Sequence, residues 1–185
     1  MTATDLDALD RLILERSVKR GHFVLASGRT SNFYIDCRLT TMSAQGLALI
    51  GRLGLIALRS AGWTPRAVGG LTMGADPVAY AIAAASVTAT PIVDAFSVRK
   101  EAKAYGAGRR VEGNFSTGDR VVVVEDVITT GGSALKAIEA IREEGGEVLG
   151  ILAVVDREEG GRTALETAGW KVVSLTTATR LGLKT

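Results

Sequence analysis

Four consecutive valines, Val121–Val124, stand directly before two acidic residues, Glu125 and Asp126. An unbroken β-branched run suits a strand that is covered on both faces, as in a parallel sheet. The next segment, Thr129-Thr-Gly-Gly-Ser133, has turn chemistry, and an apolar pattern of helical spacing follows it. The sequence therefore predicts a buried strand that delivers two carboxylates to its C-terminal end, then a short turn, then a new helix.

The rest of the chain alternates between helical and extended patterns, which is typical of an α/β fold. Ser43 is an expected helix cap, and Asp76-Pro77 marks the expected start of another helix. We predict a mostly parallel central sheet flanked by helices, with a small N-terminal β-hairpin. The expected helices cover about residues 5–19, 44–59, 76–85, 133–144 and 162–168, and the expected extended segments cover 23–25, 32–35, 67–70, 91–93, 96–98, 120–124, 148–155 and 171–175.

One long stretch, about residues 99–119, shows neither pattern. Structureless segments of this length are uncommon in a compact domain and are more often functional. Basic residues gather in it: Arg99, Lys100, Lys103, Arg109 and Arg110. A mobile loop that brings positive charge to an anionic ligand is one interpretation, and a solvated charge run or a nucleic-acid patch is the other. Tyr105 is the one aromatic residue in this basic part, which is few for stacking on bases.

The composition limits the other classes of protein. A chain of 185 residues with 46% apolar and 23% charged residues is ordinary for one globular domain, so we expect a single domain over 1–185. The net charge of +2 gives no general reason to expect nucleic acid, and the longest uncharged stretch, 77–93, is short for a membrane span. Cys37 is the only cysteine, which agrees with a cytoplasmic location. A single histidine excludes zinc sites that need several His or Cys ligands.

The turn after the acidic pair has the chemistry of an anion cradle. Gly131 and Gly132 let the backbone approach a ligand closely, and the helix that follows presents free N–H groups and the positive end of its dipole. A terminal phosphate is the best match. The carboxylates of Glu125 and Asp126 suit ribose hydroxyls, or a metal that bridges hydroxyls and phosphate oxygens. The simpler alternative is a capped helix beside two solvated carboxylates.

The segment Val-Val-Glu125-Asp126-Val-Ile-Thr-Thr-Gly-Gly-Ser133 resembles the signature with which type I phosphoribosyltransferases bind 5-phosphoribosyl 1-diphosphate (PRPP). The resemblance implies that the acidic pair holds the ribose hydroxyls and that 129–133 bind the 5-phosphate. The PRPP-binding residues implied here are Glu125, Asp126, Val127, Ile128, Thr129, Thr130, Gly131, Gly132 and Ser133.

Four further segments are similar to the orotate enzymes within that family: 23–36, 70–77, 98–113 and 156–161. The segment 23–36 resembles a hairpin that helps to form the orotate pocket, which implies contacts from Phe33 and Tyr34. The segment 70–77 is similar to the loop beside the pyrophosphate, and 98–113 is similar to a mobile catalytic loop. The segment 156–161 places Arg157 where an arginine meets the orotate carboxylate, and Thr129 is implied as a further orotate contact. An ion pair of Arg157 with Glu158 or Glu159 at the surface is the alternative.

The resemblance also assigns the chemistry of the basic loop. Breaking the bond between ribose and pyrophosphate moves negative charge onto the leaving group, and Arg99, Lys100 and Lys103, together with Mg²⁺, are suited to receive it. Lys103, Arg99 and Asp126 are the expected catalytic residues, and Tyr105 is an expected contact with PRPP. We expect no direct protein ligand for Mg²⁺, which would be held mainly by PRPP. The sequence departs from many orotate enzymes at Ala26, where lysine is common, and at Tyr105, where histidine is common. It also departs at Met73 from those members that have lysine there.

The resemblance implies a homodimer in which the loop of one subunit reaches the neighbour's site. It also implies a hood made of about residues 1–40 and the C-terminal end of the chain. The small-molecule partners would be orotate and PRPP, without nucleic acid or membrane. Two other functions compete with this one. An enzyme for another base, such as a purine, is disfavoured by Arg157 and the hairpin, and a PRPP-sensing regulator would need a DNA-binding module or a broad basic face.

Overall fold

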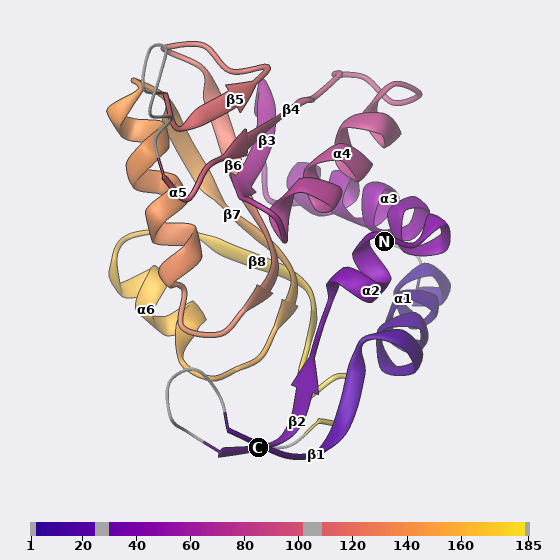
Figure 1. The fold of residues 1–185 in the computed structure, drawn as a ribbon. Coiled ribbons are helices and arrows are strands. Elements are labelled where there is room, and N and C mark those ends of the chain that lie inside the picture. The colour runs from indigo at the N-terminus through magenta and orange to yellow at the C-terminus, as the bar shows by residue number, and fades with distance from the viewer. Residues whose placement is uncertain (1–2, 25–29, 102–108, 184–185) are drawn as a thin grey trace.

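The computed structural model describes residues 3–24, 30–101 and 109–183 (Figure 1). Within these ranges the main sheet has the strand order β5-β4-β3-β6-β7-β8, and all neighbours run parallel except β4 and β5. This topology confirms the predicted α/β class with a mostly parallel sheet. The strands are β3 (Ala67–Leu71), β4 (Asp94–Val98), β5 (Val111–Gly113), β6 (Arg120–Ile128), β7 (Glu147–Asp156) and β8 (Val172–Thr177).

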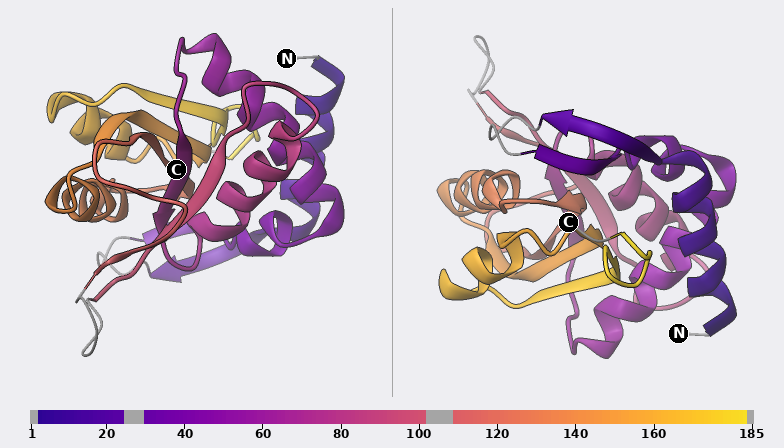
Figure 2. Two further views of the ribbon diagram at one scale, coloured as in Figure 1. Left: turned by 90° about the horizontal axis from the view of Figure 1, so that it is seen from above. Right: turned by 90° about the horizontal axis from the view of Figure 1, so that it is seen from below.

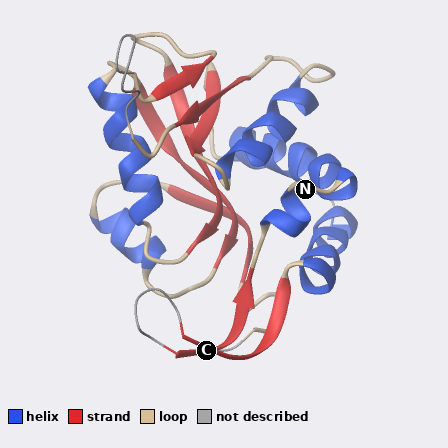
Figure 3. Ribbon diagram, viewed as in Figure 1, coloured by secondary structure: helices blue, strands red, loops and turns tan. Residues whose placement is uncertain are grey.

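Helices cover both faces of the sheet (Figure 3). Val122 and Val124 of β6 pack into the cluster on the side of α3 and α4, and Val121 and Val123 pack into the cluster on the side of α5. Both sets are completely buried, which explains why this strand shows no polar alternation. The helices are α1 (Ala3–Arg16), α2 (Arg38–Thr41), α3 (Ala44–Ser60), α4 (Ala75–Ser86), α5 (Gly132–Glu143) and α6 (Gly161–Thr167).

A separate two-stranded antiparallel sheet joins β1 (Val18–Val24) to β2 (Thr30–Ile35). Figures 1 and 2 show this hairpin beyond the end toward which the parallel strands point. Arg180, near the end of the chain, forms ion pairs with Asp7 at 2.7 Å and Asp10 at 2.6 Å. The C-terminal segment is therefore tied to α1, next to the hairpin.

Several boundaries differ from the sequence prediction. α1 ends at Arg16 rather than near residue 19, because Val18 and Lys19 pair with Ile35 and Tyr34 in the hairpin. Asp76 lies inside the first turn of α4, whose cap is Gly74. The stretch 99–119 was predicted to lack structure, but it contains β5, which pairs with β4. The 91–93 segment joins no strand.

The cap at Ser43 is confirmed, since its hydroxyl accepts a hydrogen bond from the Gly46 N–H at 3.1 Å. None of the helices in the described ranges combines the length and the apolar character that a membrane span requires.

Candidate active site

The turn between β6 and α5 is built around a glycine that no other residue replaces easily. Gly131 caps α5 in the left-handed region, with φ of 82°. A Cβ on Gly131 would also lie 2.9 Å from Cγ of Leu165 in α6. Both the backbone conformation and the close packing of α6 therefore require glycine at this point of the turn.

The backbone amides of this turn line a pocket. Thr129–Ser133 and Glu125 line a small pocket whose solvent-accessible volume is about 30 Å³. Within the described ranges, the backbone N–H groups of residues 129–133 donate no hydrogen bond to a backbone carbonyl in a turn, loop or cap. Free N–H groups at a helix N-terminus bind anions, because the helix dipole adds to their partial positive charge. The structure thus brings the predicted phosphate-binding residues together in one cradle.

Glu125 is a buried carboxyl group beside this cradle, only 5% exposed. Burial, and secondarily the charge of Asp126, raises the pKa of Glu125 to about 8. Its Oε1 atom is buried without a hydrogen-bond partner among the described residues. A buried polar atom in this state is a candidate for contact with a bound ligand.

Asp126 follows on the strand and lies against the loop between β3 and α4. A Cβ on Gly74 would come within 2.6 Å of its Oδ1 atom. That oxygen also accepts a hydrogen bond from the Val127 N–H at 2.8 Å. Burial raises the pKa of Asp126, and the nearby guanidinium of Arg38 lowers it by a smaller amount. The expected pyrophosphate loop, 70–77, therefore meets the acidic pair directly.

Arg157 follows β7 and is buried, with 3% exposure. Its guanidinium carbon lies 4.7 Å from the centre of the Phe33 ring. The Nη2 atom donates to the Ser31 hydroxyl at 3.3 Å and forms an ion pair with Glu159 at 2.6 Å. The alternative of an ion pair with Glu159 is therefore confirmed, but this pair is buried and does not lie at the surface.

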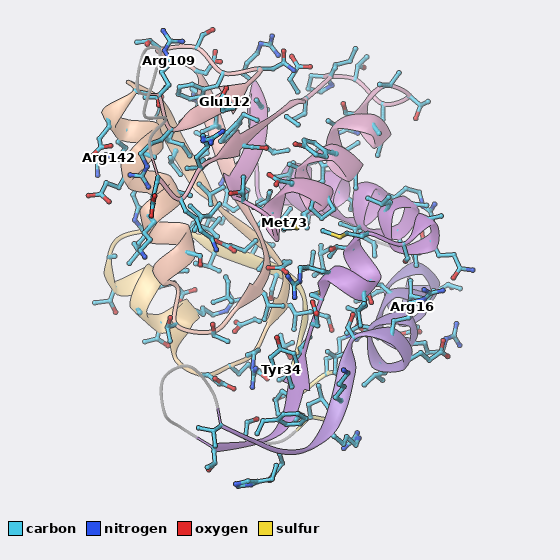
Figure 4. All side chains as sticks on the ribbon, in the orientation of Figure 1. Arg16, Tyr34, Met73, Arg109, Glu112 and Arg142 are labelled. Atoms are coloured by element: carbon cyan, nitrogen blue, oxygen red, sulfur yellow. The ribbon has the colours of Figure 1, made fainter. Side chains whose placement is uncertain are left out.

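Tyr34 is 40% exposed and next to the buried Phe33, so the two side chains alternate along β2. The Tyr34 ring packs near Phe23 of β1, with ring centres 5.9 Å apart. Figure 4 labels Tyr34 on the hairpin. It also labels Met73 of the expected pyrophosphate loop in the middle of the molecule, and the Met73 side chain is 60% exposed. The two expected orotate contacts therefore lie on opposite faces of β2, and Phe33 is the one that packs against Arg157.

Arg99 and Lys100 follow directly after β4 and are exposed. Arg99 reaches Glu112 of β5 with an Nη1–Oε1 distance of 3.8 Å. Lys103, Tyr105 and Ala26 lie outside the described residues, so their expected roles stay predictions.

Sequence reasoning missed a pair of residues at the end of the hairpin. Asp36 accepts two hydrogen bonds from the Arg38 guanidinium, at 2.8 and 2.9 Å. Both charges influence Asp126, since Arg38 lowers and Asp36 raises its pKa. The available signal was their position, since Asp36 ends the orotate-like segment 23–36 and Arg38 follows it closely.

The described residues contain no group of three His, Cys, Asp or Glu side chains that would hold a metal ion by themselves. A parallel sheet edge with an acidic pair and a glycine-opened helix N-terminus is typical of α/β proteins that bind phosphate-bearing ligands. Residues 42–177 match the family described as the phosphoribosyl transferase domain.

Proteins that are similar to this chain over almost its whole length show which phosphoribosyltransferases it is related to. The orotate phosphoribosyltransferase of Aquifex aeolicus is 46% identical over 178 residues, which cover 95% of this chain and 96% of the relative. The Mycobacterium tuberculosis enzyme of the same name is 46% identical over 183 residues, covering 99% of both chains. A crystal structure of the latter with PRPP superimposes with a TM-score of 0.80 at 42% identity, covering 97% of this chain and 99% of that one. This chain belongs to the orotate phosphoribosyltransferase family.

Proposed function

We propose that this chain transfers the ribose 5-phosphate group of PRPP to orotate, giving orotidine 5-phosphate and pyrophosphate in pyrimidine biosynthesis. The observation that carries the proposal is the open amide cradle at 129–133, at the same sheet edge as the buried Arg157. The cradle at 129–133 suits a phosphate, and the guanidinium of Arg157 suits a planar carboxylate. That combination fits a reaction that joins a sugar phosphate to an acidic base.

In this proposal the amides and hydroxyls of 129–133 hold the 5-phosphate, and the backbone of Val127 and Ile128 belongs to the same binding strand. Glu125 and Asp126 hold the ribose hydroxyls. The raised pKa of Glu125, about 8, supports this role, because a protonated carboxyl near neutral pH does not repel the phosphate beside it. Asp126 lies against Gly74, and this contact supports a role of the expected pyrophosphate loop at the same ribose.

The residues fit Mg²⁺ held mainly by PRPP. Two carboxylates are too few for a protein cage, whereas Mg²⁺ typically uses one or two carboxylates with substrate phosphates and water. Glu125 and Asp126 would be the residues nearest to such an ion. When bound, the ion would supply positive charge to the departing pyrophosphate.

The basic loop would supply the remaining charge. Arg99 and Lys100 are exposed at the end of β4, where they can approach an anionic leaving group. Lys103 and Tyr105 belong to the same proposed loop, which joins β4 to β5. Preorganised cations at the position of developing charge typically contribute about 10²–10³ in kcat each.

The base would bind between the hairpin and the end of β7. Arg157 would clamp the orotate carboxylate with its planar fork, Phe33 would support the guanidinium, and Thr129 and Tyr34 would contact the ring. The hood of about residues 1–40 with the C-terminal end would close this side. Its support is the pair of contacts from Arg180 to Asp7 and Asp10.

The proposal includes a homodimer in which each loop serves the neighbour's site, and a cytoplasmic location. A single buried cysteine, Cys37, is the support for a reducing compartment. Residues 99–101 and 109–110 extend outward from the sheet in Figure 2, which supports a loop that acts beyond its own subunit.

The test is to follow the loss of orotate absorbance with PRPP and Mg²⁺, for the unchanged chain and for Lys100→Ala and Lys103→Ala. We expect the unchanged chain to turn over orotate, and we expect the rate to be lower in both variants. Turnover with a purine base but not with orotate would contradict the base assignment. PRPP binding without turnover of any base would contradict catalysis itself.

A further inference from the structure

The C-terminal end of α5 carries two acidic residues, Glu143 and Glu144. The negative end of the helix dipole disfavours carboxylates at this position. Glu143 is exposed, with a side-chain exposure of 60%, whereas Glu144 is partly buried. An acidic side chain at this end of a helix therefore needs compensating donors, and Glu144 has them.

One carboxylate oxygen of Glu144 accepts two consecutive backbone hydrogen bonds. Oε1 receives the Arg110 N–H at 2.7 Å and the Val111 N–H at 2.9 Å. These two residues lead into β5, the short edge strand that follows the basic loop. The side chain thus holds the point where the returning arm of the loop joins the sheet.

Arg110, which Glu144 holds, in turn fixes the segment that leaves β4 toward the basic loop. The carbonyl of Arg110 accepts a hydrogen bond from the Arg99 N–H at 2.8 Å, which extends the β4–β5 ladder by one step. Arg99 and its neighbour Lys100 are the described cations of the basic loop that the proposed reaction uses. Glu144 is therefore linked to Arg99 through a single residue.

α5 joins this anchor to the phosphate cradle. The helix begins at Gly132 in the cradle and ends at Glu143, so it spans 12 residues, or about 18 Å at 1.5 Å per residue. Its C-terminal end is also fixed to the loop before β6, since the Gly145 carbonyl accepts the Gly118 N–H at 2.9 Å. Figure 4 labels Arg109, Glu112 and Arg142 at this same end of the molecule, far from Tyr34.

We propose that Glu144 is a positioning residue, whose carboxylate oxygen holds the base of the basic loop so that Arg99 and Lys100 are presented in register with the cradle at the other end of α5. This deepens the proposed function and rests on it. The essential feature is the reach of an acceptor oxygen to two amides. The negative charge of the side chain is incidental.

Two variants distinguish the length of the Glu144 side chain from its negative charge. Glu144→Gln keeps an acceptor oxygen at the same distance and removes the charge, so kcat stays near that of the unchanged chain. Glu144→Asp keeps the charge but is one methylene shorter, so it loses the two amides. A misplacement of about 1 Å remote from the reacting atoms costs up to about 10²-fold, and we expect Glu144→Asp to lower kcat about 10- to 100-fold. The KM for orotate stays unchanged, because the base binds elsewhere.

Amide hydrogen exchange at Arg99, Arg110 and Val111 provides a readout that does not depend on activity. These amides exchange faster in Glu144→Asp and not in Glu144→Gln. The matched control is Glu143→Gln, since Glu143 forms a long ion pair with the Arg110 side chain, at an Nη1–Oε2 distance of 3.8 Å. Its exchange and kcat stay near those of the unchanged chain.

The proposal is overturned if Glu144→Gln is as impaired as Glu144→Asp, or if Glu144→Asp has unchanged kcat and exchange. A fall in kcat that simply follows a fall in melting temperature across the variants would also overturn it. If the unchanged chain does not turn over orotate, the proposed function fails, and exchange at the three amides still decides whether Glu144 holds the loop base.

Discussion

The guanidinium carbon of Arg157 lies 4.7 Å from the centre of the Phe33 ring, so the end of β7 meets the hairpin at a buried point. A cation over an aromatic face is attracted more strongly when both are desolvated. Glu159 balances the charge with an ion pair at 2.6 Å. Removing one partner of a buried pair leaves an uncompensated charge and costs about 3–5 kcal/mol. A test of Arg157 must therefore keep its charge.

Arg157→Lys meets that condition. Lysine keeps a positive charge opposite Glu159 but loses the planar fork that binds a carboxylate through two parallel hydrogen bonds. A hydrogen bond to a charged group contributes about 1.5–3 kcal/mol, so we expect the KM for orotate to rise about 10- to 100-fold. Initial rates with varied orotate at saturating PRPP measure it.

The control for this variant is Arg66→Lys, which changes an exposed arginine paired with Asp94 just before β3. The KM for orotate stays unchanged in the control. An unchanged KM for orotate in Arg157→Lys would remove Arg157 from the base site.

Glu125→Gln tests the buried carboxyl through the pH dependence of stability. The pKa of Glu125 is raised from 4.5 to about 8 in the folded protein. Between these values the folded state holds a proton that the unfolded chain has lost, so the free energy of unfolding falls as pH rises through this window. Glutamine does not ionise. We expect the variant to melt at a higher temperature than the unchanged chain above pH 8, with no difference below pH 4.5.

Thermal unfolding followed by circular dichroism from pH 4 to 9 provides the measurement. A chain of this size shifts its Tm by about 2–4 °C per kcal/mol. The same variant should lose activity, since glutamine replaces a ribose contact. Parallel Tm curves for the two proteins across the whole range would show that Glu125 ionises with an ordinary pKa.

Gly131→Ala tests the cradle against a glycine with the same backbone conformation. Gly131 and Gly169 have φ of 82° and 90°, so alanine at either costs about 1–2 kcal/mol. A Cβ at Gly169 meets nothing within 4 Å, whereas one at Gly131 meets Leu165. We expect both variants to lose stability, and only Gly131→Ala to raise the KM for PRPP, by about tenfold for a loss of about 1.4 kcal/mol of binding.

Melting temperatures and rates with varied PRPP separate the two effects. Equal KM values for PRPP in the two glycine variants would mean that the turn at Gly131 has a structural role alone.

The cradle was predictable from sequence because local signals agreed there. The valine run, the acidic pair and the two glycines each favour the same structure, and α5 begins at Gly132, one residue before the predicted start. β7 likewise extends only one residue beyond each predicted end. Local propensity and tertiary packing point the same way in these elements.

The missed features depend on residues distant in the chain. The burial of Arg157 comes from Phe33 and Ser31, which are more than 120 residues away, and a run of charged neighbours favours the surface. β5 has three residues and is fixed by β4 and by Glu144. No pattern within a short segment carries this information.

Gly74→Ala tests whether the loop before α4 controls the acidic pair. Gly74 has ordinary helical angles, φ of −66° and ψ of −39°, so alanine brings no backbone strain. Its Cβ would lie 2.6 Å from Oδ1 of Asp126, and the carboxylate must move. A displaced ribose contact lowers kcat/KM for PRPP, by about 10- to 100-fold for a shift near 1 Å.

A double-mutant cycle with Asp126→Asn decides the route of that effect. If the alanine acts by moving Asp126, the double variant is no slower than the slower single variant, since the group that moves has already lost its function. Losses that multiply would mean that Gly74 contributes independently, for example by approaching the pyrophosphate itself. Because Gly74 and Asp126 follow different strands, coupling between them would mean that the loop after β3 fixes the position of the carboxylate on β6.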